Sequence, residues 1–200
     1  TGMPGKAIKH LLTASAAEYD PTVVGLLLVE SYIKSGEMDK GTSVAKNLAE
    51  NMPDNANIQH HLGYIYQISG EIEKAKHQFE QALAIEPNHT KSIVSLANLD
   101  YQKGNADIAI NRLKTALIIS ANDIDLITAL SKLYNRTNNS AASIILLEEP
   151  FKLDKKNEAL LKNLIVSYVG DKQLMLAIET LNTYLLNQRK TVELYIMLAS

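Results

Sequence analysis

Hydrophobic residues follow a helical spacing along this chain, and the residue at i+34 repeats the character of residue i without an insertion. Three columns of the repeat, counted in units that start from residue 22, each share one kind of side chain. The seventh position is always leucine: Leu28, Leu62, Leu96, Leu130, Leu164 and Leu198. The twentieth is small throughout: Ala7, Gly41, Ala75, Ala109, Ser143 and Ala177. The eleventh is mostly aromatic: Tyr32, Tyr66, Asp100, Tyr134 and Tyr168. No segment alternates with the period of two that strands require, so the pattern predicts an all-α fold of stacked repeats.

Each unit is predicted to contain two antiparallel helices, called helix A and helix B in chain order. Such a pair cannot bury both of its apolar faces alone, so neighbouring pairs must stack into one continuous core. The small residue at position 20 allows helix B to approach helix A closely. Glycine at position 15 suits the left-handed backbone that ends helix A, and Pro53 and Pro87 follow helix B, where a helix must stop.

The repeat period divides the chain without gaps. Residues 1–21 form the helix B half of an incomplete unit, and five whole units follow at 22–55, 56–89, 90–123, 124–157 and 158–191. Residues 192–200 begin another helix A. We expect both ends to be cuts in a longer protein, because Thr1 is not a natural start. Leu194, Tyr195 and Leu198 would then have no following helix B, which predicts end-to-end association between copies.

The unit at 56–89 resembles the tetratricopeptide repeat. Its matching positions are Leu62, Gly63, Tyr66, Gly70, Ala75, Phe79, Ala82 and Pro87. Gln59 stands where the motif has tryptophan. The resemblance implies a right-handed superhelical solenoid of antiparallel helix pairs, with helix A on the inside and a protein or peptide segment as the partner.

A narrower resemblance covers residues 40–145 well and the rest of the chain loosely, and the unit that contains Leu62 and Gly63 is part of it. The run Ser95-Leu96-Ala97-Asn98-Leu99-Asp100-Tyr101-Gln102-Lys103-Gly104-Asn105, with Leu133-Tyr134-Asn135-Arg136-Thr137-Asn138, resembles bacterial PEP-CTERM/exosortase-associated lipoproteins. This resemblance implies a cell-envelope protein, lipid-anchored upstream of residue 1, that supports exopolysaccharide export or assembly. A cytoplasmic location is the alternative.

Composition excludes some partners and leaves others open. The formal net charge is −2, so no basic surface points to nucleic acid. No apolar run reaches the length of about 18 residues that a membrane span needs. The chain contains no cysteine, which excludes disulfides and thiolate metal sites.

The sequence offers no catalytic constellation and predicts neither a cofactor nor a metal. His60 and His61 are adjacent, so on a helix they point about 100° apart and do not share a metal ion. We expect them, like His77 and His89, to face solvent. Glu148 and Glu149 are likewise consecutive rather than facing. The chain is therefore predicted not to be an enzyme.

The positions that line the inner face in the tetratricopeptide repeat predict a polar, aromatic and mildly basic groove. An extended peptide is the expected ligand, since amide side chains both donate and accept hydrogen bonds. The groove residues are His60, His61, Tyr64, Gln67, Lys91, Asn98, Tyr101, Lys132, Asn135, Arg136, Lys162 and Asn163. The carboxylate clamp of chaperone-binding repeats is absent, because its positions hold His60, Tyr64, Ser95, Asp125 and Ala129.

Three residues break the repeat pattern. Asp100 occupies the aromatic column, where a buried and unpaired carboxylate would be costly. Pro150 stands at position 27 of helix B and predicts a kink or break between Leu146 and Phe151. Asn138 replaces the turn glycine of the same unit, so we expect the second half of the array to be less regular.

The leading function is therefore a protein-binding scaffold. A structural self-assembly module is the alternative from a different class. A binding domain that serves a larger cytoplasmic regulator, or an enzyme on the same polypeptide, is a further alternative.

Overall fold

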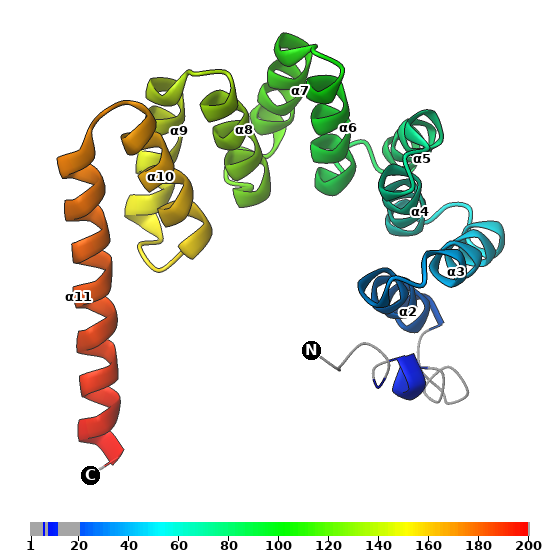
Figure 1. The fold of residues 1–200 in the computed structure, drawn as a ribbon, viewed down its shortest axis with the longest axis horizontal. Helices are drawn as coiled ribbons and strands as arrows, with labels where there is room; N and C mark the ends of the chain where they lie inside the picture. Colours follow the sequence, from blue (N-terminus) through cyan, green and yellow to red (C-terminus); the bar gives the residue numbers. More distant parts are fainter. Residues whose placement is uncertain (1–5, 7, 12–20, 200) are drawn as a thin grey trace. The chain divides into compact units, whose positions relative to one another are not determined.

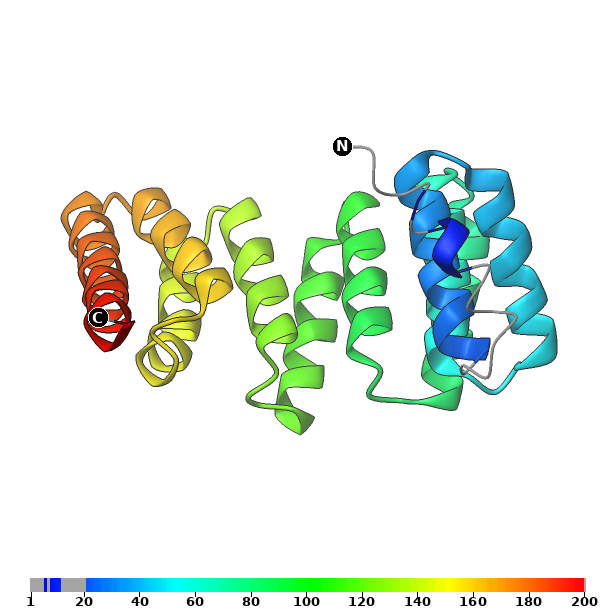
Figure 2. The ribbon, with the colours of Figure 1, turned by 90° about the horizontal axis from the view of Figure 1, so that it is seen from below.

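A computed structural model describes residues 6, 8–11 and 21–199 of the chain, with side chains described for residues 6, 8–11 and 22–186. Every regular element in this part of the chain is an α-helix (Figures 1 and 2). From residue 21 onward the helices are α2 (Pro21–Ser35), α3 (Met38–Asn51), α4 (Ala56–Ile68), α5 (Ile72–Ile85), α6 (Thr90–Gln102), α7 (Ala106–Ile119), α8 (Ile124–Arg136), α9 (Ser140–Leu153), α10 (Glu158–Gly170) and α11 (Leu174–Ala199). The all-α prediction is confirmed.

The helices alternate as the repeat period predicts. The helices α4, α6, α8 and α10 begin at Ala56, Thr90, Ile124 and Glu158, one repeat period apart each time. Side chains cap several of these starts, because the first N–H groups of a helix lack partners within it. The Asn55 side chain accepts from the Ile58 N–H, and Asp123 and Asn157 accept from two N–H groups each.

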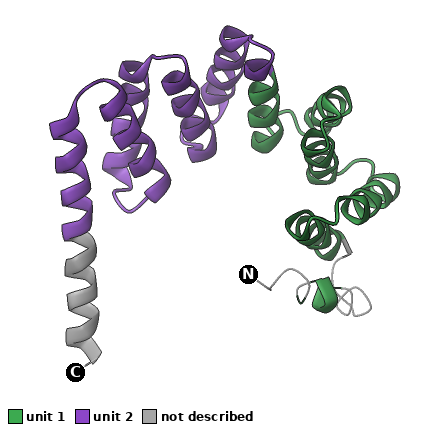
Figure 3. Ribbon diagram, viewed as in Figure 1, with its two compact units in different colours: residues 1–99 green, residues 100–200 purple. Residues whose placement is uncertain are grey.

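The chain divides into two compact units, residues 1–99 and residues 100–200 (Figure 3). In unit 1, α2 packs against α3 and α4 packs against α5. The apolar cluster around Val29, Ile58 and Ile65 joins α2, α3 and α4, and all three of these residues are fully buried. A second cluster places Phe79 of α5 against Leu96 and Leu99 of α6.

Helix α4 approaches α5 so closely that only glycine fits at position 63. A Cβ atom built on Gly63 would lie 2.7 Å from a ring carbon of Phe79 and 3.1 Å from the Ala75 carbonyl oxygen. Both distances are shorter than ordinary contacts, so the close helix pair depends on Gly63 and on the small Ala75.

In unit 2, α8 packs against α9, and α10 contacts both α8 and α9. Leu147 of α9 and Leu160 of α10 are fully buried in one cluster together with Leu164. Helix α10 therefore rests on the hairpin before it. This is how stacked helix pairs bury faces that one pair leaves open.

All five turns from helix A to helix B in the described part of the chain use a left-handed residue. Gly36, Gly70 and Gly104 have φ of 81°, 79° and 83°, and Asn138 and Lys172 keep the same conformation with φ of 57° and 62°. The N–H of the next residue closes each turn on the carbonyl of position 11, as in Gln173 to Tyr168 at 2.7 Å. The turn thus keeps its shape where glycine is lost, so Asn138 does not make this turn irregular.

Of the kink or break predicted at Pro150, the break is wrong, and the kink stays a prediction. Helix α9 continues from Ser140 to Leu153 with Pro150 inside it. Pro150 lies in the last turn of the helix, and its own carbonyl still accepts from the Asp154 N–H at 3.0 Å. Only the one hydrogen bond that proline cannot donate is lost, close to a helix end that solvent reaches.

The C-terminal helix also differs from expectation. Helix α11 runs without interruption over 26 residues, from Leu174 to Ala199. A turn and a separate helix from residue 192 are therefore not formed in this structure. The expected turn at residues 188–191 reads Gln-Arg-Lys-Thr, with neither proline nor glycine, and three of its four residues favour helices.

Two expectations fall outside the described residues. Most of the helix B half expected at residues 1–21 is one, although Ile8 is helical and packs with Val24, Leu28 and Tyr32. The exposure of Leu194, Tyr195 and Leu198 is the other.

The left-handed turns make a direct prediction. Replacing Gly104 by alanine should lower the free energy of unfolding by about 1 kcal/mol, because an added Cβ meets nothing within 4 Å and only the backbone is strained. Replacing Lys172 by glycine should raise it by about 0.5–1 kcal/mol for the same reason. Urea denaturation followed by circular dichroism measures both changes. Destabilisation by Lys172→Gly would show that the turn is held by something other than backbone conformation.

Candidate functional site

A hollow on the helix A side of unit 1 brings several predicted groove residues together. Its volume is about 330 Å³, and its lining comes from α2, α4 and α6. The lining residues are Glu30, Ile33, Lys34, His60, His61, Tyr64 and Lys91. Four of the residues predicted from the repeat register, namely His60, His61, Tyr64 and Lys91, therefore share one pocket.

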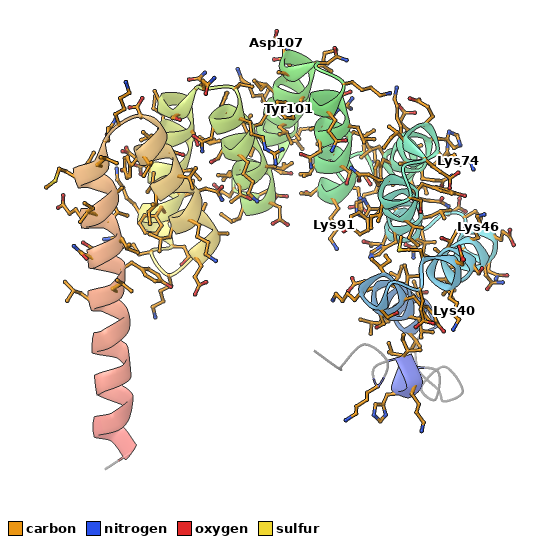
Figure 4. The ribbon with its side chains drawn as sticks, in the orientation of Figure 1. Lys40, Lys46, Lys74, Lys91, Tyr101 and Asp107 are labelled. Atoms are coloured by element: carbon orange, nitrogen blue, oxygen red, sulfur yellow. The ribbon has the colours of Figure 1, made fainter. Side chains whose placement is uncertain are left out.

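The pocket contains one acid and two lysines, and the two lysines are not equivalent. Lys34 lies 3.7 Å from the Glu30 carboxylate, and both side chains are exposed, so this pair contributes little. Nε2 of His61 lies 3.7 Å from the other Glu30 oxygen. No ion pair joins the Lys91 ammonium to a residue in the described part of the chain. Lys91 extends from the first turn of α6 (Figure 4) and is the cation that remains available for a ligand.

Two buried histidines support the pocket: His60 lines it, and His89 packs against His60. His60 and His89 are only 8% and 6% exposed, and their ring centroids lie 5.4 Å apart. The His60 ring also lies 5.3 Å from the Phe79 ring. The expectation that His60 and His89 face solvent is therefore wrong. The close packing of α4 on α5 and α6 turns these rings inward.

A chain of hydrogen bonds fixes the tautomers of both rings. The Asn57 side-chain oxygen can only accept, so Nε2–H of His89 donates to it, at 3.3 Å. Nδ1 of His89 then accepts from the Ser92 hydroxyl at 2.9 Å, and that hydroxyl accepts from Nδ1–H of His60 at 3.3 Å. Both imidazoles are neutral in this arrangement.

Burial keeps the imidazoles neutral. Desolvation, together with the nearby charges of His61, His89 and Lys91, lowers the pKa of His60 from 6.5 to about 3. Burial also lowers the pKa of His89, partly opposed by Glu86. These rings are thus a structural support of the pocket and not proton-transfer groups at neutral pH.

In unit 2, the predicted groove residue Tyr101 is paired with Arg136. The guanidinium carbon, in the last turn of α8, lies 5.6 Å from the centroid of the half-buried Tyr101 ring. Such a contact is worth about 0.5–1 kcal/mol at an exposed site. Lys132 and Lys162 are exposed, and Lys162 lies 3.8 Å from Glu158.

Two predicted groove amides are used inside unit 2. The Asn135 side-chain NH2 donates to the Ser167 hydroxyl at 2.9 Å and to the Ser143 hydroxyl at 3.3 Å. Asn163 is buried, and its amide donates to the Ala159 carbonyl at 2.7 Å. These contacts lie within the packed helices, so neither amide group is directed at a ligand. The Asn135 side-chain oxygen is buried and has no partner among the described residues.

Asp100 is compensated rather than unpaired. Nε of Arg112 in α7 donates to the Asp100 carboxylate at 2.9 Å, and a second guanidinium nitrogen lies equally close. The carboxylate side chain is 17% exposed. Asp100, which interrupts the aromatic column, thus forms a salt bridge between the two helices of a hairpin. The repeat motif did not indicate this pair.

A spacing rule could have found several of these pairs. Asn57–His89, His60–Ser92 and Asn135–Ser167 are each separated by 32 residues, two less than the repeat period. Polar residues on consecutive A helices, or at the residue just before one, therefore meet at i and i+32. Asp100–Arg112 and Ser131–Ser143 share a separation of 12, which joins helix A to helix B within a hairpin.

The described residues form neither a metal-binding cluster nor a membrane-spanning helix. No group of three or more histidine, aspartate or glutamate side chains is placed to hold a metal ion there. Within the same part of the chain, no helix combines the length and hydrophobicity needed to cross a bilayer. Of the remaining predicted groove residues, Asn98 is exposed and Gln67 is half-buried.

Comparison with known proteins agrees with this architecture. Residues 66–133 match the family model of the tetratricopeptide repeat. Human tetratricopeptide repeat protein 7B is 28% identical over 120 residues, or 60% of this chain, and anaphase-promoting complex subunit 7 of Arabidopsis thaliana is 28% identical over 68% of it. The chain spans only 14% and 25% of these relatives' lengths.

Solved structures share the fold. A tetratricopeptide repeat protein of Thermus thermophilus, TTC0263, superposes with a TM-score of 0.71 at 17% identity, covering 84% of this chain and 92% of that one. The matches support the interpretation of the chain as a tetratricopeptide repeat protein, and its fold is that of the tetratricopeptide solenoid. Proteins built on this fold generally mediate protein–protein interactions and are generally not catalytic.

The buried histidines predict an acid-sensitive unit 1. Because the pKa of His60 is lower in the folded chain than its unfolded value of 6.5, the unfolded chain binds more protons once pH falls below 6.5. Stability is therefore full above that pH and is lost progressively below it. Between pH 7.5 and 5.0 we expect His60 alone to lower the free energy of unfolding by about 2 kcal/mol.

The control for this prediction is His60→Phe, which keeps a ring against Phe79 and removes the titration. Urea denaturation at several pH values should show a flatter profile for the variant than for the unaltered chain. Equal slopes in the two chains would mean that His60 titrates normally in the folded state.

Proposed function

We propose that this chain is a non-catalytic scaffold that holds an extended polypeptide segment against the helix A side chains of unit 1. The observation that carries the proposal is the pocket between α2, α4 and α6, with the Lys91 ammonium at its rim. A cavity of about 330 Å³ accommodates a single side chain, not a folded domain. This size suits an extended segment that places one residue in the hollow.

The surface of the pocket indicates which residue that is. Ile33 and the 44% exposed Tyr64 provide apolar contact, while Lys91 provides an uncompensated positive charge. A ligand with an acidic side chain next to an aromatic or aliphatic residue would pair with the Lys91 charge and pack on the apolar surface. The chemistry expected of the ligand is therefore an acidic, partly hydrophobic peptide, whose binding should weaken moderately with salt.

The test uses a peptide library, since the natural partner is not identified. Panning the chain against displayed random dodecapeptides should enrich acidic sequences that contain an aromatic or aliphatic residue. Fluorescence anisotropy then gives the affinity of an enriched peptide. Lys91→Ala should weaken that affinity about tenfold, equivalent to about 1.4 kcal/mol, and Tyr64→Ala by a similar factor.

Lys114→Ala is the matched control, because this exposed lysine lies on helix B (α7) in the other unit. It removes the same charge and should leave affinity unchanged. Equal losses of affinity for Lys91→Ala and Lys114→Ala would mean that the net charge of the chain, and not the pocket, determines binding. No loss for either pocket variant would move the peptide site away from this hollow.

The cellular role we propose is support of exopolysaccharide export or assembly in a bacterial cell envelope, with the full-length protein lipid-anchored. The support is the resemblance of residues 95–105 and 133–138 to PEP-CTERM/exosortase-associated lipoproteins. The alternative is a binding domain of a larger cytoplasmic regulator.

Fractionation and crosslinked pull-down of the full-length protein from its native cell separate these roles. Recovery from the envelope fraction with a lipid-modified cysteine, together with export-system proteins, supports the first. Recovery from the cytosol without lipid overturns it in favour of the regulator.

A further inference from the structure

A hydrogen bond fixes the tautomer of His61, which lines the pocket of unit 1. Nδ1 of His61 lies 2.7 Å from the Asn57 carbonyl oxygen, which belongs to the preceding turn of α4. A carbonyl oxygen only accepts hydrogen bonds, so Nδ1 carries the hydrogen and donates it. In the neutral ring, Nε2 therefore carries the lone pair and is a hydrogen-bond acceptor.

Two acceptors face each other between α2 and α4. Nε2 of His61 lies 3.7 Å from Oε1 of Glu30, which is longer than a hydrogen bond. Both residues line the pocket, and their side chains are 12% and 48% exposed. Either a proton on Nε2 or a donor group of a ligand satisfies this pair, because neither acceptor can donate to the other.

The spacing of the two acceptors favours a primary ammonium group as the donor. A nitrogen atom can lie about 2.9 Å from both atoms at once, because the acceptors are only 3.7 Å apart. An ammonium group has three N–H donors and serves both acceptors, whereas a backbone amide has a single N–H. The ammonium charge also complements the Glu30 carboxylate, and charge-assisted hydrogen bonds are about twice as strong as neutral ones.

Lys34 competes for Glu30 from outside the acceptor pair. Its Nζ lies 3.7 Å from Oε2, the other oxygen of the Glu30 carboxylate. The Lys34 side chain is 71% exposed, and ion pairs this exposed contribute little. A ligand ammonium between Glu30 and His61 gains a second acceptor and is less exposed to water, so it binds Glu30 more strongly than Lys34 does.

We propose that the pocket recognises a peptide by two opposite charges, an ammonium group held between Glu30 and His61 and a carboxylate held by Lys91. The ammonium group is the free N-terminus of the ligand or a lysine side chain, since both have the same donors. The three binding residues come from α2, α4 and α6, so a ligand that spans the hollow meets both charges. This inference rests on the proposed function and narrows its ligand from an acidic peptide to one that carries both charges.

The test compares charged and neutralised forms of one peptide from the library selection, labelled at its C-terminus. The forms are the free peptide, the N-acetylated peptide, the peptide with norleucine for each lysine, and the peptide with both changes. Fluorescence anisotropy should show about tenfold weaker binding for the doubly changed form. The single changes identify which ammonium group is bound.

Equal affinity for the free and doubly changed forms overturns the inference. The proposed function is then still judged by Lys91→Ala, which tests the carboxylate contact alone. A selection that enriches no peptide overturns both.

Glu30→Gln should abolish the preference for the charged peptide. The amide keeps the shape of the carboxylate, loses its charge and donates to His61 itself, so the free and doubly changed peptides should bind within about twofold of each other. The matched control is Glu80→Gln on α5, because the Glu80 carboxylate also lies 3.7 Å from a lysine at i and i+4 spacing, Lys76. This control should keep the tenfold preference. A preference that Glu30→Gln retains overturns the ammonium site.

Lys34→Ala should change affinity in the opposite direction. The free peptide should bind this variant about threefold more tightly, because the competing lysine is gone. A peptide bound only through its acidic side chains should bind more weakly, because the pocket loses a positive charge. Weaker binding of the free peptide to Lys34→Ala therefore contradicts the inference, even where Lys91→Ala confirms the proposed function.

Discussion

The structure depends on one constraint: a hairpin of two short helices cannot bury its apolar faces without the next hairpin. Leu147 of α9 is fully buried only because α10 lies over it, and Phe79 of α5 is buried in the same way by α6. Leu181 of α11, one repeat period after Leu147, is 40% exposed. The pocket of unit 1 is a surface that this stacking leaves open.

The repeat period predicted those features that depend on position within a hairpin. Where the side chains are described, the leucine and small-residue columns are buried as expected, and the left-handed turn is kept at Asn138 and Lys172 without glycine. The seventh-position and twentieth-position residues pack whatever their neighbours are, because backbone proximity decides their environment. This is why the sequence sufficed for the all-α hairpin architecture.

The polar residues were harder to place because their environment depends on pairs. His60 occupies a groove position, yet its ring is buried, because it packs against the ring of Phe79 and hydrogen-bonds to the hydroxyl of Ser92. Asn135 likewise serves Ser143 and Ser167. A single column of the repeat cannot reveal such partners. The recurring separations of 32 residues between consecutive A helices and of 12 residues within a hairpin do reveal them. Proline was misjudged for another reason: Pro150 lies so near the end of α9 that one missing hydrogen bond does not interrupt the helix.

The dependence of each hairpin on its neighbour is most directly measured by a double-mutant cycle on the free energy of unfolding. Leu147→Ala and Leu164→Ala remove side chains that share one buried cluster across α9 and α10. We predict a coupling energy of about 1 kcal/mol or more for this pair. The comparison pair, Leu113→Ala with Leu164→Ala, lies on α7 and α10 and should be additive within about 0.5 kcal/mol. Additivity of Leu147 with Leu164 would contradict the account, because each hairpin would then be stable without the one that covers it.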